Sequence, residues 1–357
     1  MKKFLMTLLI LVLGLVIVGC GDDEGQYDVI LVTDHGPVND NSFNQGSWEG
    51  VEAYGKDHKI KYHYLRPSEN SAAGRMAAID LAAESGAKVI VTPGFSFAGP
   101  IFEAQTKYPN IKFILLDATP SKDGQTNIAE NTISIFYDEA QSGFLLGYAA
   151  VHDGFRNLGY MGGAGVPAVI RFGSGFIQGA EKAANELTLE DNSVKVKYTH
   201  LGGFQPNTEF NVMATSWYND DVELIFCAAG TAINNIITAA ESHPSGQKWV
   251  MGANVPQNHL SEKIISSGLK QLKNSVYQQL ELYYKGKFVG GKSITLDASN
   301  AGVGITDDFS RFKTFTKAKY EEMFGKLANG TVTVNTSGEI SVLTQLGLKK
   351  VVVDNQL

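Results

Sequence analysis

The sequence predicts an α/β protein made of two doubly wound lobes. Short β-branched apolar runs alternate with helical patterns over the first part of the chain, and the same alternation restarts after residue 154. The 357-residue chain also exceeds what one hydrophobic core usually serves. Parallel sheets of this kind are buried on both faces and bind ligands beyond the carboxyl ends of their strands. We therefore expect two lobes with a ligand site in the gap between them.

The predicted elements follow one another in two similar series. In the first unit, strands at 28–33, 61–65, 88–92 and 112–117 alternate with helices at 43–56, 71–85 and about 98–108. A helix over 137–154 leads to the second unit, with strands at 157–163, 194–200, 223–229 and 248–253 and helices near 170–187, 208–219 and 231–242. The rest predicts a long helix at about 260–285, a helix near 313–328, and strands near 293–296, 331–335 and 349–353. We expect one lobe from 27–137 plus about 254–292, and the other from 138–253 plus about 293–357.

The N-terminal segment indicates export and membrane attachment. Residues 1–19 begin with two lysines and continue as an apolar run that is short for a membrane-spanning helix, as in a signal peptide. The sequence Ile-Val-Gly-Cys at 17–20 resembles a lipobox, which predicts acylation (palmitate) of Cys20 and a tether over 20–26. The expected location is the extracytoplasmic face of the cell membrane. Cys227 lies in an apolar run, so we expect a buried, unpaired thiol.

The charge pattern and the missing motifs exclude several classes of function. The formal charge is −7 without any basic block, which argues against binding to nucleic acid. The seven histidines show no spacing typical of a metal site, and the glycines at 162–165 lack the lysine of a phosphate-binding loop. We expect no metal and no cofactor.

One polar loop, residues 33–50, runs directly into a predicted helix and carries a lone aromatic, Phe43. Its other candidate ligand-binding residues are Asp34, Asn39, Asp40, Ser42 and Asn44. A simpler interpretation is that Asp40 and Ser42 cap the helix. The helix that follows has the pattern G-x-x-x-G-[VA]-E from Gly46, and the first helix of the second unit has the same pattern from Gly175. A phenylalanine stands three residues before each of these glycines: Phe43 before Gly46, and Phe172 before Gly175. Glycine weakens a helix unless close packing requires it, so the repeat indicates two related lobes that each point a phenylalanine at the gap.

The predicted strand ends bring together residues suited to a neutral ligand. They are Asp34, Thr92 to Phe95, Asp117, Gly162 and Gly163, Gly230 and Thr231, and Asn254. Aromatic rings can stack on a flat ligand, while amides and carboxylates bond to its edge and hydroxyls. A hydroxyl-rich molecule with one flat apolar face fits this set.

Several of these segments resemble the basic membrane protein family of PnrA-like lipoproteins, the substrate-binding components of nucleoside ABC transporters. The resemblance is carried by VTDHGPVNDNSFNQGSWEG, LLDATP, NTISIFYDEAQSGFLLGYAA, GYMGGAGVPAVIRFGSGFIQGAEKA and ISSGLKQLKNSVY, and extends from about residue 27 to 290. It implies a type I periplasmic-binding-protein fold with two lobes joined by a hinge. It also implies a purine nucleoside ligand, a membrane permease as partner, and a monomer.

Position by position, the resemblance assigns roles to individual residues. Phe43 matches the first stacking aromatic, Lys270 a lysine that faces the sugar, and Asp117 the acid after the fourth strand. The second stacking aromatic of the family matches Phe204, whereas the internal repeat indicates Phe172. Both residues are therefore candidates for the second stacking ring. The chain departs from the family at Asn254 and Pro256, where relatives carry acids. This departure leaves the contacts of the second lobe, and the choice of nucleoside, open.

The sequence fits several other classes of function less well than it fits transport. A nucleoside hydrolase would need several carboxylates around one calcium ion, and too few are grouped near Asp34. A transcription regulator would need a DNA-binding segment where the signal peptide lies. A ligand-sensing lipoprotein and a sugar-binding transport protein remain alternatives.

Overall fold

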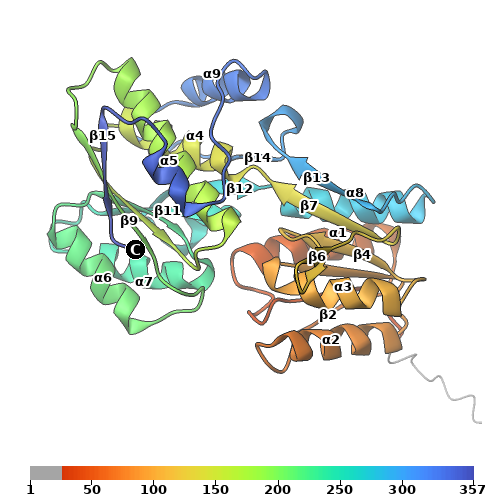
Figure 1. Ribbon diagram of the computed structural model, residues 1–357. Helices are drawn as coiled ribbons and strands as arrows, with labels where there is room; N and C mark the ends of the chain where they lie inside the picture. Colours follow the sequence, from red (N-terminus) through yellow and green to blue (C-terminus); the bar gives the residue numbers. More distant parts are fainter. Residues whose placement is uncertain (1–25) are drawn as a thin grey trace, which may run out of the picture.

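The computed structural model describes residues 26–357, which form two α/β lobes beside each other (Figure 1). The predicted signal peptide, Cys20 and most of the tether lie outside the described residues. Among the residues that are described, no helix is long and apolar enough to cross a membrane.

The first lobe is a parallel sheet covered by helices on both faces. Its strand order is β13-β7-β4-β3-β1-β2. These strands are β1 (Val29–Val32), β2 (Tyr62–Leu65), β3 (Val89–Pro93), β4 (Lys112–Leu116), β7 (Thr132–Tyr137) and β13 (Lys292–Leu296). Helices α1 (Phe43–His58) and α8 (Leu272–Tyr284) cover one face, and α2 (Ala72–Glu84) and α3 (Ala98–Lys107) the other. Alternate residues of β1 enter the two cores, Val29 and Leu31 on one side and Ile30 and Val32 on the other, as the pleat of a strand requires.

The second lobe repeats this layered arrangement. Its sheet has the order β14-β12-β11-β10-β8-β9-β15, parallel except for β14. The strands are β8 (Asn157–Gly162), β9 (Val194–His200), β10 (Leu224–Ala228), β11 (Trp249–Asn254), β12 (Ile264–Lys270), β14 (Val303–Ile305) and β15 (Val351–Asn355). Helices α4 (Glu139–His152), α5 (Pro167–Glu186) and α9 (Lys317–Ala328) pack on one face, and α6 (Thr208–Asn219) and α7 (Ile233–Ser242) on the other. Cys227 is buried and free, as predicted.

Short elements connect these layers. They are the hairpin of β5 (Ser121–Lys122) and β6 (Gln125–Thr126) and the 3-10 helices η1 (Phe95–Phe97), η2 (Gly230–Ala232), η3 (Asn258–Leu260), η4 (Ala298–Asn300) and η5 (Ile340–Thr344). Two of them, η1 and η2, follow directly after strands β3 and β10 and lie at the ligand side of each sheet.

Three segments cross between the lobes. The chain leaves the first sheet after β7 and enters α4, returns from β12 into α8, and leaves again after β13. The first and third crossings are hydrogen-bonded to each other, because the backbone N–H of Asp138 donates to the carbonyl of Leu296 at 2.8 Å. The two lobes are therefore joined by a narrow bundle of crossing strands, which is the hinge of a type I periplasmic-binding-protein fold.

The C-terminal part of the chain differs from the prediction. Residues 264–270 are the buried strand β12 of the second sheet, where we predicted a helix in the first lobe. Strand β13 belongs to the first sheet, so that lobe takes 271–296 rather than about 254–292. Residues 331–335 form no strand, and β7 was not predicted. Strand β12 was misread because its sequence, IISSGLK, is rich in small residues and runs directly into a helical pattern.

The repeated helix glycines allow close backbone contact, as predicted. A Cβ at Gly50 of α1 would lie 2.6 Å from the carbonyl oxygen of Lys273 in α8. At the crossing of α4 and α5 the approach is closer still, since a Cβ at Gly179 would lie 1.9 Å from the carbonyl oxygen of Phe144. These glycines pack the helices of each lobe and do not face the ligand site.

Candidate ligand-binding cleft

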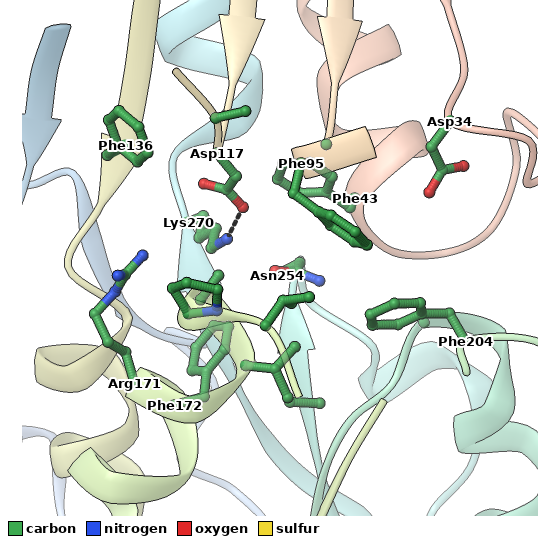
Figure 2. A pocket seen from close by; sticks show the side chains of 18 of the residues that line it. Asp34, Phe43, Phe95, Asp117, Phe136, Arg171, Phe172, Phe204, Asn254 and Lys270 are labelled. Carbon is green, nitrogen blue, oxygen red and sulfur yellow. Dashed lines mark hydrogen bonds and ion pairs between the residues drawn. The ribbon is translucent and has the colours of Figure 1, made fainter. Parts of the chain in front are cut away.

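A cavity of about 370 Å³ lies between the lobes, at the carboxyl ends of both sheets (Figure 2). The candidate residues that line it are Asp34, Asp40, Ser42, Phe43, Asp117, Phe172, Phe204, Gly230, Asn254 and Lys270. Two predicted residues do not line it. Asn39 is exposed, and Asn44 is buried behind the loop.

The loop after β1 is held in shape by its own carboxylates. The oxygens of Asp40 accept backbone N–H bonds from Ser42 (2.8 Å), Asn44 (3.1 Å) and Gln45 (3.0 Å) at the start of α1. The amide nitrogen of Asn44 donates to both Asp40 and Asp34, at 3.0 Å each. Asp40 therefore caps the helix, as in the simpler interpretation, and Asn44 ties the cap to the end of β1. The side chain of Ser42, the other cap considered, makes no capping bond.

These bonds occupy only one of the two carboxylate oxygens of Asp34. Its Oδ1 accepts the backbone N–H groups of His35 and Gly36, both at 2.8 Å, in addition to Asn44. Its Oδ2 takes part in none of these bonds, and Asp34 is one of the residues that line the cavity. Asp34 can therefore accept an N–H from a ligand without losing its place in the loop.

Five phenylalanines of the described residues line the cavity. Phe43, Phe95 and Phe136 come from the first lobe, and Phe172 and Phe204 from the second (Figure 2). Phe172 is only 2% exposed and packs edge-on against Phe226 in the core, whereas Phe204 is partly exposed. Phe95 is 47% exposed and was not predicted as a site residue, although it follows a strand end. The two lobes thus present opposed aromatic side chains to the gap.

Phe204 is positioned by glycines and by η2. A Cβ at Gly163 would lie 2.3 Å from the Phe204 ring, so only glycine leaves room for the ring there. The carbonyl oxygen of Phe204 accepts the hydroxyl of Thr231 at 3.0 Å and the N–H of Ala232 at 3.1 Å. Gly230 has the left-handed φ of 56° and begins this turn.

Four charged side chains, of which Lys270 and Glu139 are buried and Asp117 and Arg171 partly buried, form a chain at the hinge end of the cavity. The ammonium of Lys270 pairs with Asp117 at 2.5 Å and with Glu139 at 2.7 Å, and the guanidinium Nε of Arg171 pairs with Glu139 at 2.6 Å. The same ammonium lies 4.8 Å from the centre of the Phe43 ring and 5.7 Å from that of Phe172. The sequence did not indicate Glu139 or Arg171 as site residues, although Arg171 precedes Phe172.

The electrostatics of this end follow from burial. Burial raises the pKa of the Asp117 carboxyl, and the ammonium of Lys270 opposes that rise. Burial lowers the pKa of Lys270, but the two carboxylates outweigh it and leave that pKa raised. Lys270 is therefore a cation at neutral pH. The Oδ1 atom of Asp117 is buried and has no hydrogen-bond partner among residues 26–357. Asp117 and Lys270 both line the cavity, so this end combines a carboxylate with a cationic donor.

Asn254 joins the two lobes directly. Its side-chain amide donates to the hydroxyl of Ser42 at 2.9 Å, and nearby the amide of Gln257 donates to the carbonyl of Asn41 at 2.8 Å. Asn254 has a left-handed φ of 73°, which asparagine tolerates better than most residues. An aspartate here could accept a hydrogen bond from the Ser42 hydroxyl but could not donate one to it.

Metal chemistry finds no support in the part of the chain that the structure describes. No group of three or more His, Cys, Asp or Glu side chains in it is placed to hold a metal ion. The cleft instead combines aromatic faces with hydrogen-bonding groups, the usual make-up of a small-molecule site.

Comparison with known proteins places this cleft in a transport context. The ABC transporter nucleoside-binding protein BmpA of Lactococcus lactis subsp. cremoris is 27% identical over 83% of this chain and 87% of its own. An uncharacterized lipoprotein of Pyrococcus abyssi is 26% identical over 85% of this chain and 74% of its own. Among solved structures, an ABC transporter solute-binding protein from Aeropyrum pernix K1 matches with a TM-score of 0.79 at 20% identity, covering 90% of this chain and 97% of that one. The family model for Bmp, described as ABC transporter substrate-binding protein PnrA-like, matches residues 27–338, and the chain therefore belongs to this family of substrate-binding proteins.

Proposed function

We propose that the cleft binds a purine nucleoside and that the protein delivers it to a membrane permease. The observation that carries the proposal is the order of groups along the cavity. Asp34 has a free carboxylate oxygen at one end, Phe43 and Phe204 face each other across the middle, and Asp117 with Lys270 forms the other end. A base between the rings would have its edge at Asp34 and its sugar at Asp117 and Lys270.

Phe204 rather than Phe172 is assigned as the ring opposite Phe43. Phe172 is packed in the core of the second lobe, with only 2% of its surface exposed. Phe204, also of the second lobe, is partly exposed and can offer a ring face to a base in the cavity.

The charges favour a nucleoside over a nucleotide. Three carboxylates and two cations line the cavity, and Glu139 behind it adds a fourth carboxylate. Both cations are already paired with these carboxylates. A phosphate would add negative charge to a buried site that has no free cation among the lining residues, which is unfavourable.

We further propose that Cys20 carries the lipid anchor and holds the cleft at the extracytoplasmic face of the membrane. The motivation is the lipobox-like sequence at 17–20, together with the lipoprotein among the relatives. The protein would then act as a monomer tethered beside its permease.

Calorimetric titration tests the ligand assignment. Protein stripped of bound ligand is titrated with guanosine, inosine, adenosine, guanosine monophosphate and glucose, and Phe43→Ala and Phe204→Ala are compared with wild type. Stacking of a base on an aromatic side chain contributes about 1–3 kcal/mol, so each variant should bind nucleosides roughly five- to more than a hundredfold more weakly. Phe288→Ala, a half-buried phenylalanine outside the cleft, is the matched control.

Two results would contradict the proposal. Binding of glucose without any nucleoside would leave a transport protein with a different ligand. Wild-type affinity in Phe43→Ala would show that the loop is only the capped start of a helix.

A further inference from the structure

Glu139 is a buried carboxylate that touches both cations of the cleft without lining the cavity. Its side chain is 0% exposed, and its two oxygens pair separately with Lys270 at 2.7 Å and Arg171 at 2.6 Å. An ionised carboxylate is costly to bury unless it is paired. Both of its partners are residues that do line the cavity.

Glu139 also lies where the lobes are joined. It is the first residue of α4, directly after the crossing from β7, and Lys270 is the last residue of β12, directly before the crossing to α8. Asp117 follows β4 in the first lobe, and Arg171 lies on α5 in the second. The four charges therefore run from the first lobe through two crossing segments into the second; Figure 2 shows the three of them that line the cavity, Asp117, Lys270 and Arg171.

The pairing leaves a defined donor and acceptor for a ligand. A lysine ammonium has three N–H donors, and Lys270 has two carboxylate partners. Asp117 lines the cavity beside Lys270, and its carboxylate oxygens can each accept more than one hydrogen bond. A hydroxyl can both donate and accept, so one sugar hydroxyl could bond to Asp117 and Lys270 together.

We infer that Glu139 is a positioning residue that holds Lys270 in register with Asp117 and so sets the recognition of sugar hydroxyls; this inference rests on the proposed nucleoside ligand. With only Asp117 as its partner, the flexible lysine side chain could move away from the hydroxyl. Glutamine at position 139 would keep the size of the side chain, but its NH₂ group would face one of the two cations. The ligand-contacting atoms would then be present but no longer fixed.

The test compares guanosine with its 2′-deoxy and 3′-deoxy analogues in wild type and in Glu139→Gln. Wild type should bind at least one analogue about tenfold or more weakly than guanosine, since a hydrogen bond to a charged group is lost. In Glu139→Gln that ratio should fall below about threefold, because the missing hydroxyl no longer has a fixed partner. A purely structural defect would weaken all three ligands by the same factor and leave the ratio unchanged.

Two further variants keep the test decisive. Asp138→Asn alters the neighbouring carboxylate, which caps α4 and pairs with neither cation, and it should keep the wild-type ratio. If Glu139→Gln does not fold, the double variant Glu139→Gln with Arg171→Gln removes one charge of each sign and leaves the Asp117–Lys270 pair. The double variant should also lose the discrimination.

The outcomes separate this inference from the proposed function. If wild type binds no nucleoside, the proposed function fails and the inference fails with it. If wild type discriminates against a deoxy analogue and the folded Glu139 variants discriminate equally well, Glu139 is not a positioning residue, while the nucleoside assignment stands. If wild type binds all three ligands equally, the inference is also overturned.

Discussion

Neighbouring residues of the loop after β1 divide between building the site and facing the ligand. Asp40 and Asn44 use their polar atoms on the start of α1 and on Asp34. Their bonds leave Phe43, the first residue of the helix, at the cavity and keep one oxygen of Asp34 available. The loop is polar because the side chains of Asp40 and Asn44 hold its backbone and Asp34 in place.

At Asp138 the chain keeps a helix cap whose ionisation is unfavourable. The side chain accepts the N–H of Gln141 at 3.3 Å, yet burial raises its pKa to about 6, Glu139 and Asp297 add to the rise, and Gln141 and Arg171 oppose it. A folded-state pKa above the ordinary 3.8 means that this group stabilises the fold below about pH 4, and that the contribution is lost as the pH rises through 6.

Asp138→Asn should therefore raise the free energy of unfolding at pH 7 by about 1–3 kcal/mol relative to wild type, and change it much less at pH 4. Asparagine is an equally good helix cap, so the cap itself is kept. Denaturant unfolding at a series of pH values measures the difference in the free energy of unfolding between the variant and wild type. The contributions of the other titrating groups are the same in both proteins and cancel in this difference. A difference that does not vary between pH 4 and pH 7 would show that Asp138 does not titrate in this range.

At the scale of elements, the lobes depend on glycines where two helices cross. In α4 and α5 the contacts are reciprocal, since a Cβ at Gly147 would lie 1.9 Å from the carbonyl oxygen of Phe176 and one at Gly179 would lie 1.9 Å from that of Phe144. These are contacts with backbone, which cannot turn aside as a flexible side chain can. The crossing brings α5, with Arg171, against α4, which begins with Glu139, so the packing of the two helices also positions the buried charges.

Gly179→Ala should lower the stability of the second lobe by about 1–3 kcal/mol or more through overpacking. Gly325→Ala in α9 is the control, because a Cβ there meets no heavy atom of the described residues within 4 Å. Alanine favours a helix over glycine by about 1 kcal/mol, so the control should be unchanged or slightly stabilised. Thermal unfolding of both variants tests this prediction, and equal melting temperatures for Gly179→Ala and Gly325→Ala would contradict the packing argument.

The strands and helices with a clear period could be predicted from the sequence, and those without one could not. Ile30, Leu31 and their neighbours form an unbroken apolar run, which indicates a buried parallel strand. Strand β12, with the sequence IISSGLK, has three small residues in a row and is followed after one residue by helix α8, so no local signal separates the two. The site was predictable where side chains follow strand ends, as at Asp34 and Asp117. Glu139 and Arg171 are 32 positions apart, and only the fold brings them together.

For the whole molecule, the hinge and the cleft depend on the same few residues. The crossings after β7 and β12 carry Glu139 and Lys270, so a change in lobe angle must shift charges that border the ligand. On the other side of the cavity, the bonds of Asn254 to Ser42 and of Gln257 to Asn41 join the lobes directly. A ligand that bonds to both lobes would favour the closed arrangement by its differential contacts.

Closure can be measured between two exposed positions beside the cleft. A second cavity of about 550 Å³ lies outside the first, and Asn70 of the first lobe and Asn207 of the second both line it. Spin labels at Ser68→Cys and Glu209→Cys, next to these residues, would report the distance across the mouth, with Cys20 replaced and Cys227 left buried. Saturating guanosine should shorten and narrow the distance distribution, because contacts to both lobes restrict the hinge.

Labels at Ser68→Cys and Lys122→Cys lie in one lobe, so their distance should not change. If the distance across the mouth also stays constant while calorimetry shows guanosine bound, the ligand is held without lobe closure and the hinge has no part in binding.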